Sequence, residues 1–394
     1  MFARLPSRRK AVARLFALLS VGWLTACVPV SPAPGGAAGP TVTPGAPVQV
    51  ALLVPSGSGD PTFDFIARNL ENGARLAIAD LSGVQIDLRV YGTAANPSQA
   101  AAVAATAVND GARIILGPLS AEEANAVGVA VAGTGINVLS FSNNPTIAGG
   151  NVFILGPTFR NTADRLVRYG LRNGIQRYMI VYSEDLQGTV GRDAIASAVR
   201  NNGADVGGIE SYPVSQQGIV AAAARIVAAT KAAGADAIFL TAGINSELPI
   251  LATALPEAGL NPADTRYIGL TRWNAAPQAL ALPGLQGGLF AVPDQQLSAS
   301  FESRYAAAYS EAPLPQAGTA YDGIAAIGAL IARGGNDALG RDSLTQGQGF
   351  QGTAGIFRLL ADGTNERGLA IAEVRNNQVT ILEQAPRSFG GAGF

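Results

Sequence analysis

The segment VQVALLVPSGSG, residues 48–59, sets the pattern that the rest of the chain follows. Residues 48–54 are mostly apolar, and residues 55–59 contain only Pro, Ser and Gly, which favour turns. A short apolar run bounded by turn residues is typical of a buried strand in a parallel sheet. Apolar residues then recur at helical spacing from Phe63 to Ala77, which predicts a helix after the turn.

The same alternation of strand and helix continues along the chain. In the first half, strands are predicted at 86–91, 113–116 and 137–141, and helices at 97–109 and 121–132. After Gly156-Pro157, strands are predicted at 177–182, 206–212, 237–241 and 265–270, and helices at 163–173, 190–202, 219–233 and 247–258. Such alternation indicates parallel sheets covered on both faces. We therefore expect two similar α/β lobes, each a parallel sheet flanked by helices.

The last third of the chain is expected to complete both lobes. Residues 289–293 are predicted to cross back to the first lobe, residues 301–333 to be strongly helical, and residues 369–382 to form a hairpin around Asn376-Asn377. The expected divisions are 1–26, an export signal; 27–47, a lipidated cysteine and tether; 48–386, the folded body; and 387–394, a tail. Within the body, lobe 1 is expected at about 48–156 and 294–368, and lobe 2 at about 157–293 and 369–386.

The N-terminal segment has the features of an export signal. Five basic residues lie within residues 4–14, an apolar run follows at 15–24, and small residues precede Cys27. The sequence Leu24-Thr25-Ala26-Cys27 resembles a bacterial lipobox, which implies that Cys27 carries the lipid. The alternative is an ordinary signal peptide with a free or buried cysteine. The next residue is Val28, not the Asp associated with inner-membrane retention, so the resemblance implies an outer-membrane anchor facing the periplasm, if the cell is Gram-negative.

The composition weighs against several classes of function. The chain has 394 residues, a formal net charge of −1, no histidine and one cysteine. Without histidine or a spare thiol, Ser-His-Asp triads, Cys-His dyads and the usual transition-metal sites are excluded. The neutral balance gives no electrostatic reason to expect nucleic acid as a partner. We therefore expect neither an enzyme nor a protein that holds a metal or cofactor.

Several further motifs resemble one family over about residues 48–385. They are VNDGARIILGPLSAEEA, INVLSFSNN, GTAYDGIAAIGALIA and FQGTAGIFRLLADGTNERG, each in the expected order, although Phe357 stands one place early in the last. Together with the opening strand and turn, they are similar to type I periplasmic binding proteins of the branched-chain amino-acid-binding kind. The resemblance implies a two-lobed fold with ligand held between the lobes, at the carboxyl ends of strands.

In that family, hydroxyl and backbone N–H groups hold the ligand's α-carboxylate, and an acidic residue holds its α-ammonium. Ala121 stands where a serine is expected, beside Ser120, and Gln187 stands where a tyrosine is expected, near Tyr182. The candidate ligand-contacting residues that the resemblance implies are Ser58, Ser120, Ser142, Asn144, Gln187, Glu247 and Tyr321. Because two neutral anchors are altered, a polar ligand other than a standard α-amino acid is also expected to fit.

Five of these residues also have an ordinary structural interpretation. Ser120 and Ser142 sit where helices are expected to start, so each is a candidate helix cap, and Asn144 precedes Pro145 in a candidate turn. Glu247 suits the first turn of a helix. Tyr321 is a candidate packing residue, and its neighbour Asp322 is expected on a solvated face. A Gly-x-Gly after the first strand, without further glycines and a downstream acid, does not indicate a nucleotide site.

Two functions follow from these resemblances. Some lipoproteins with this fold bind and activate penicillin-binding proteins, the synthases of peptidoglycan, and the anchor at Cys27 favours this function. The alternative is a lipoprotein that captures amino acids or related polar solutes for an ABC permease. An enzyme on the same scaffold is a third hypothesis, which the missing residue types disfavour.

Overall fold

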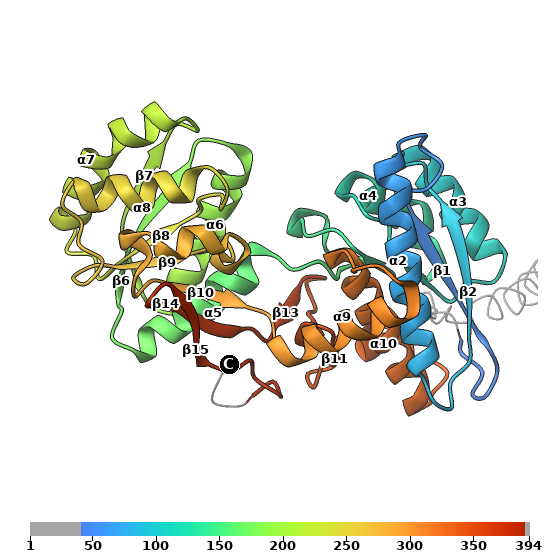
Figure 1. Ribbon diagram of the computed structural model, residues 1–394. Helices are drawn as coiled ribbons and strands as arrows, with labels where there is room; N and C mark the ends of the chain where they lie inside the picture. Colours follow the sequence, from blue (N-terminus) through green and yellow to red (C-terminus); the bar gives the residue numbers. More distant parts are fainter. Residues whose placement is uncertain (1–40, 391–394) are drawn as a thin grey trace, which may run out of the picture. The chain divides into compact units, whose positions relative to one another are not determined.

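The computed structural model describes residues 41–390 of the chain. The predicted export signal, Cys27 and most of the predicted tether lie outside the described residues. Within this range, the backbone forms three sheets, which we call A, B and C, and the helices that cover them (Figure 1).

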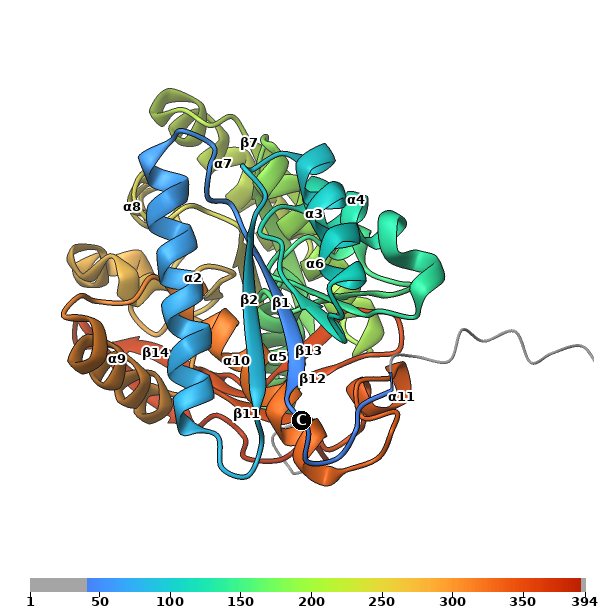
Figure 2. The same ribbon diagram turned by 90° about the vertical axis from the view of Figure 1, so that its right-hand side faces the viewer.

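Sheet A is wholly parallel, with the strand order β2-β1-β3-β4-β5. Its strands are β1 (Val48–Val54), β2 (Ile86–Gly92), β3 (Ile114–Leu116), β4 (Val138–Ser140) and β5 (Val152–Ile154). The helices between them are α2 (Pro61–Asp80), α3 (Pro97–Asn109) and α4 (Ala121–Val131). Strand β1 is buried throughout because it lies inside the sheet and is covered on both faces. Val50 and Leu52 pack towards α2, whereas Ala51 and Leu53 pack towards α3 and α4. Figure 2 shows α2 on one side of β1 and β2 and the helices α3 and α4 on the other.

Sheet B has the order β15-β14-β10-β9-β8-β6-β7. Its strands pair in parallel except for β14, which is antiparallel to both β10 and β15. Its strands are β6 (Arg177–Ser183), β7 (Asp205–Tyr212), β8 (Ala237–Leu240), β9 (Arg266–Gly269), β10 (Leu289–Val292), β14 (Ala370–Arg375) and β15 (Gln378–Glu383). Its helices are α5 (Phe159–Arg172), α6 (Leu186–Asn201), α7 (Gln216–Ala232) and α8 (Glu247–Glu257). One core contains α7 and α8, and the other contains α5 and α6, so both faces of this sheet are also covered.

Sheet C is a small antiparallel sheet that the sequence analysis does not predict. It consists of β11 (Phe350–Gly352), β12 (Gly355–Leu359) and β13 (Asn365–Arg367), and β11 packs against α10 (Pro315–Arg333). Strand β5 is also absent from the prediction. Strands β5, β11 and β13 have three residues each, too few to show a period by themselves.

One expectation for the last third of the chain needs correction, and another is confirmed. The segment predicted to cross back to the first lobe instead forms β10 inside sheet B, and the chain leaves that sheet only after Val292. The stretch 301–333 is strongly helical as predicted, and it contains two helices, α9 (Gln295–Tyr309) and α10. The break follows from Ser310, which has a left-handed backbone conformation with φ of 56°, and from Pro315, which starts α10.

The predicted fold class and the predicted hairpin are confirmed. The chain has an α/β fold in which sheet A is parallel and sheet B is mixed, each flanked by helices. Strands β14 and β15 meet at Asn376 and Asn377, both with positive φ, as a two-residue hairpin turn requires. The chain enters or leaves the elements of sheet B at residues 155–158, 293–294 and 368–369, and we call these segments the crossings. No helix within residues 41–390 is long and apolar enough to cross a membrane.

Candidate ligand-binding site

The first group of candidate residues follows β3, at the carboxyl edge of sheet A. Ser120 precedes α4, and its hydroxyl accepts a hydrogen bond of 3.2 Å from the N–H of Glu123. The carboxylate of Glu123 accepts in return from the N–H of Ser120 at 3.1 Å. This reciprocal pair is a capping box, so the hydroxyl of Ser120 is engaged in starting the helix. Ala121, in the first turn, has no polar side chain to offer.

The loop after β4 holds two further candidates in a chain of local hydrogen bonds. The N–H of Ser142 donates to the hydroxyl of Ser140, and the N–H of Asn144 donates to the hydroxyl of Ser142, both at 3.1 Å. The side-chain oxygen of Asn144 accepts from the N–H of Thr146 at 3.0 Å, which caps a short 3-10 helix. Both side chains therefore shape the loop. Asn144 does so as its turn interpretation expects, whereas the hydroxyl of Ser142 binds within the loop and caps no helix.

Ser58 lies in the loop after β1, and this loop lines an open hollow. Its hydroxyl accepts a hydrogen bond of 3.1 Å from the N–H of Asp60. The hollow is lined by Gly57, Ser58, Ala94, Asn96, Ser98 and Gln99, which come from the loop after β1, the loop after β2 and the start of α3. Ser58, Ser120, Ser142 and Asn144 thus all follow strands of the same sheet edge, as predicted for the carboxyl ends of parallel strands.

Glu247 begins α8, just after β8 in sheet B, and it is buried. Its Oε2 accepts hydrogen bonds of 2.9 Å from the hydroxyl of Tyr212 and from the N–H of Gly243. Within the described part of the chain, its other oxygen, Oε1, accepts no hydrogen bond. Burial raises the pKa of Tyr212, and the negative charge of Glu247 raises it further, so this hydroxyl stays protonated and donates. Glu247 is therefore a fixed carboxylate with one oxygen available.

The structure places the other two candidates differently. Gln187 is exposed in the first turn of α6, while Tyr182 is half-buried at the end of β6 with Arg192 over its ring at 5.0 Å. Tyr321 faces α2 and α9, where its hydroxyl donates to Asp80 at 2.6 Å. It also lies beside Phe301, with ring centroids 5.6 Å apart, so Tyr321 is a packing residue in this structure.

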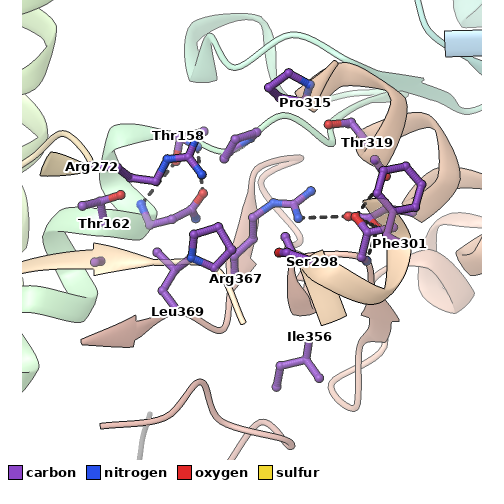
Figure 3. Close-up of a pocket in the computed structure, with 18 of the residues that line it drawn as sticks. Thr158, Thr162, Arg272, Ser298, Phe301, Pro315, Thr319, Ile356, Arg367 and Leu369 are labelled. Carbon is purple, nitrogen blue, oxygen red and sulfur yellow. Dashed lines mark hydrogen bonds and ion pairs between the residues drawn. The ribbon is translucent and has the colours of Figure 1, made fainter. Parts of the chain in front are cut away.

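A cavity of about 450 Å³ lies beside the three crossings. It is bounded by the carboxyl ends of β9 and β10, by the first turn of α5, by α9 and by the start of α10 (Figure 3). Most lining side chains are apolar or carry hydroxyls: Pro157, Thr158, Phe159, Thr162, Leu270, Thr271, Ala291, Pro293, Ser298, Phe301, Pro313, Leu314, Pro315, Thr319, Thr353, Ala354, Ile356 and Leu369. None of the seven candidate residues lines it.

Charged groups reach this cavity from several segments. Asp322 and Arg367 form a buried ion pair with 3.1 Å between Oδ2 and Nη1. The expectation that Asp322 lies on a solvated face is therefore wrong, because the side chain points from α10 into sheet C. Arg272 and Glu302 are exposed at the cavity, and neither forms an ion pair with any described residue. Figure 3 shows Arg272 and Arg367 extending from different segments into the same hollow.

No sequence pattern predicts the cavity beside the crossings, because the residues that line it come from segments more than 200 residues apart in the chain. One signal was available: the Ala320-Tyr321-Asp322 motif marks this helix, although the sequence analysis chose Tyr321 rather than Asp322. Consecutive residues on a helix do not face the same way. The described residues hold no group of three or more His, Cys, Asp or Glu side chains that is placed to bind a metal ion.

Comparisons with known structures agree with this architecture. A protein from Rhodospirillum rubrum assigned to a branched-chain amino acid ABC transporter superposes with a TM-score of 0.71 and 18% identity, over 86% of this chain and 100% of its own. A branched-chain amino acid ABC transporter periplasmic ligand-binding protein from Burkholderia xenovorans gives 0.63 and 15%, over 87% and 97%. An ABC transporter substrate-binding protein from Desulfitobacterium hafniense, in complex with Leu, gives 0.58 and 18%, over 86% and 100%.

The fold is that of the two-lobed type I periplasmic binding proteins. The family model described as periplasmic binding protein matches residues 47–378, and the chain therefore belongs to that family. No curated protein sequence matches the chain significantly. The family and the fold are those of substrate-binding proteins, and the family implies a location in the periplasm or cell envelope.

Proposed function

We propose that this protein is the substrate-binding protein of an ABC transporter and that it captures an amino acid or a related polar solute. The observation that carries the proposal is the buried carboxylate of Glu247 at the carboxyl end of β8, with Oε1 free of hydrogen bonds from the described residues. Oε1 keeps some solvent exposure although the side chain is mostly buried, so a ligand cation can reach it and pair with the carboxylate.

The geometry around Glu247 favours an ammonium group as its partner. Tyr212 and Gly243 both donate to Oε2, and these two bonds fix the carboxylate without neutralising it. A ligand ammonium has several N–H donors and a full positive charge, and it would form a charge-assisted hydrogen bond to Oε1. This is the role that the family resemblance implies for the acidic residue.

Polar groups lie at the carboxyl edge of sheet A, but the residues that usually hold the ligand's carboxylate in this family are replaced there. Ser120 and Asn144 have their side chains engaged in caps, and Ala121 offers no hydroxyl. Ser58 stands at an open hollow of the same edge. We therefore include polar solutes related to amino acids in the proposal. The similar structures named above support a transport receptor, since their descriptions are those of ABC transporter proteins.

Thermal denaturation of the purified full chain with a panel of amino acids and related polar solutes tests this function. A ligand at 100 times its dissociation constant would stabilise the protein by about 2.7 kcal/mol. We expect one class of solute to raise the melting temperature, and Glu247→Gln to abolish that rise. Glu257→Gln, on the exposed end of the same helix, is the matched control and should retain it. A broad panel without any shift would contradict the proposal.

A second candidate function rests on the lipobox-like sequence that ends at Cys27 and on Val28 after it. We propose lipidation at Cys27 and an outer-membrane anchor, from which the folded body, residues 48–386, would reach a penicillin-binding protein and activate it. The domain divisions given in the sequence analysis are part of this proposal. The purified protein should then bind a class A penicillin-binding protein and raise its transpeptidase rate. An unchanged rate without association would exclude activation, and mass analysis of the N-terminus tests the lipid separately.

A further inference from the structure

A second cavity, of about 180 Å³, lies between α5 and the hairpin formed by β12 and β13. It is separate from the candidate residues at the two sheet edges. Its lining residues are mostly charged: Arg160, Asn161, Asp164, Arg165, Arg168, Arg358, Leu360, Asn365, Glu366 and Arg367. We call this the arginine cavity, because five arginines line it against two acidic residues.

Three arginines of α5 lie close enough for their positive charges to repel one another. Arg165, Arg168 and Arg172 follow one another at spacings of three and four, so their like charges lie on one face of the helix. Burial lowers the pKa of Arg165, and the charges of Arg172 and Arg168 lower it further. Two acidic residues offset these positive charges only in part, because each is shared by two arginines. Glu383 pairs with Arg165 and Arg172, and Glu366 pairs with Arg168 and Arg358.

Two buried guanidinium groups at this cavity have donors without partners. Arg165 is 3% exposed, and its Nε and Nη2 donate to the carbonyl of Leu369 and to Glu383, whereas Nη1 has no hydrogen bond. Arg367 is 7% exposed, and its Nε also lacks a partner. An unsatisfied buried donor costs about 1–3 kcal/mol, and more when the group is charged. Folded proteins rarely leave such donors unpaired, so both groups favour a hydrogen-bond acceptor in this cavity.

We infer that the arginine cavity is a binding site for a small tetrahedral oxyanion of the phosphate or sulfate type. Guanidinium groups donate two parallel hydrogen bonds to such oxyanions, and several guanidiniums from two elements surround this cavity. Water would satisfy individual donors in a polar cavity of this size, but it adds no negative charge where two arginines share one carboxylate, as at Glu366 and Glu383.

The half-buried arginines provide the accessible contacts. Arg168 and Arg358 are 27% and 30% exposed. Arg168 gives only its Nη2 to Glu366, whereas Arg358 gives Nε and Nη2 to Glu366 and Nη1 to the carbonyl of Gly347 at 3.3 Å. An anion between them would bridge α5, which packs on β10 of sheet B, and the hairpin of sheet C. Its binding would therefore stabilise the contact between these two elements. That contact includes the Arg168–Glu366 and Arg160–Asp362 ion pairs and a hydrogen bond of 2.9 Å from Asn161 to the carbonyl of Asn365.

Titration of the purified full chain with inorganic phosphate tests the inference, with heat of binding and phosphorus NMR linewidth as readouts. Phosphate stabilises many proteins non-specifically, so sodium chloride at matched ionic strength and an arginine variant elsewhere are both needed. We expect saturable phosphate binding that Arg168→Gln and Arg358→Gln each weaken about tenfold or more. Arg225→Gln, which removes an exposed arginine of α7 paired with Glu210, should bind phosphate like the parent.

Several outcomes would overturn the inference. They are the absence of saturable binding, an equal effect of chloride, and equal weakening by Arg225→Gln. Sulfate should compete with phosphate, since both are tetrahedral oxyanions, and failure to compete would also contradict the proposed class of ligand. Because the readout is phosphate itself, a negative result here leaves the proposed capture of an amino acid or related solute unaffected.

Discussion

Asp322 of α10 and Arg367 of β13 form a buried ion pair, 3.1 Å between Oδ2 and Nη1, that joins a long helix to the small sheet C. The other carboxylate oxygen accepts hydrogen bonds from the N–H and the hydroxyl of Thr353, at 2.7 and 3.1 Å. Burial raises the pKa of Asp322, while the charge of Arg367 and the bonds from Thr353 oppose that rise. Both members of the pair are buried, so each charge is stabilised mainly by the other.

Removing one partner of this pair should destabilise the protein strongly. Asp322→Asn keeps the shape of the side chain but leaves Arg367 buried without a counter-charge, which costs about 3–5 kcal/mol. We expect a lower urea midpoint with an unchanged slope. Glu302→Gln, which neutralises an exposed acid at the same cavity, should change the midpoint little. A loss of less than about 1 kcal/mol for Asp322→Asn would contradict this account.

The hydrogen bond from Tyr212 to Glu247 gives a second prediction. Tyr212→Phe removes a donor from a buried carboxylate, and hydrogen bonds to charged groups contribute about 1.5–3 kcal/mol. Tyr267→Phe is the matched control, because Tyr267 is equally buried in the same core but donates to the neutral carbonyl of Leu260 at 2.9 Å. We expect chemical denaturation to show a larger loss for Tyr212→Phe. Equal losses in the two variants would show that the charge of Glu247 is not involved.

The sequence predicts the alternation of strands and helices because strands such as β1 are buried on both faces. Nearly every residue of such a strand is apolar, and this gives a clear run in the sequence. Helix α3 was predicted with its observed bounds, because Pro97 starts it and Asn96 caps it through hydrogen bonds to two N–H groups. Sheet C was missed because its pairing depends on contacts with α10 that no local pattern contains.

The candidate site residues come from the family resemblance, and local rules supply only their alternative interpretations. Glu247 is a candidate because the family places an acidic residue in the loop after β8, and it lies in the first turn of α8. Ser120 follows a strand in the same way, and the structure shows its hydroxyl in a capping box, an alternative that the sequence left open. Side-chain direction decides between such alternatives. Neither the Asp322–Arg367 pair nor the arginine cavity has a signal in any single segment, since both join α-helices to the hairpin of sheet C.

The contact between α2 and α10 should be sensitive to a single added methyl group. A Cβ on Gly73 would lie 2.1 Å from the carbonyl oxygen of Ala317, so the two helices would have to move apart. Overpacking of this kind costs about 1–3 kcal/mol or more, and we expect Gly73→Ala to lower the melting temperature accordingly. Gly133→Ala is the control, since nothing lies within 4 Å of a Cβ at that position. If Gly73→Ala melts like the parent, the close approach of these helices is not a feature of the protein.

The turn between β12 and β13 should contribute to the acid sensitivity of the fold. Desolvation raises the pKa of Asp362, but hydrogen bonds from Thr364 and the charge of Arg160 together outweigh it, so the pKa is lowered overall. A carboxyl with a lowered pKa stabilises the folded state fully above its unfolded pKa of about 3.9, and this contribution is lost as the pH falls through the folded pKa. Asp362→Asn should therefore flatten the fall in melting temperature below about pH 4, and Thr364→Val should flatten it less. The measurement needs buffers without phosphate, because Arg160 also lines the arginine cavity. If the melting temperature falls with pH below about pH 4 in the same way in the parent and in Asp362→Asn, then the pKa of Asp362 does not differ between the folded and unfolded states.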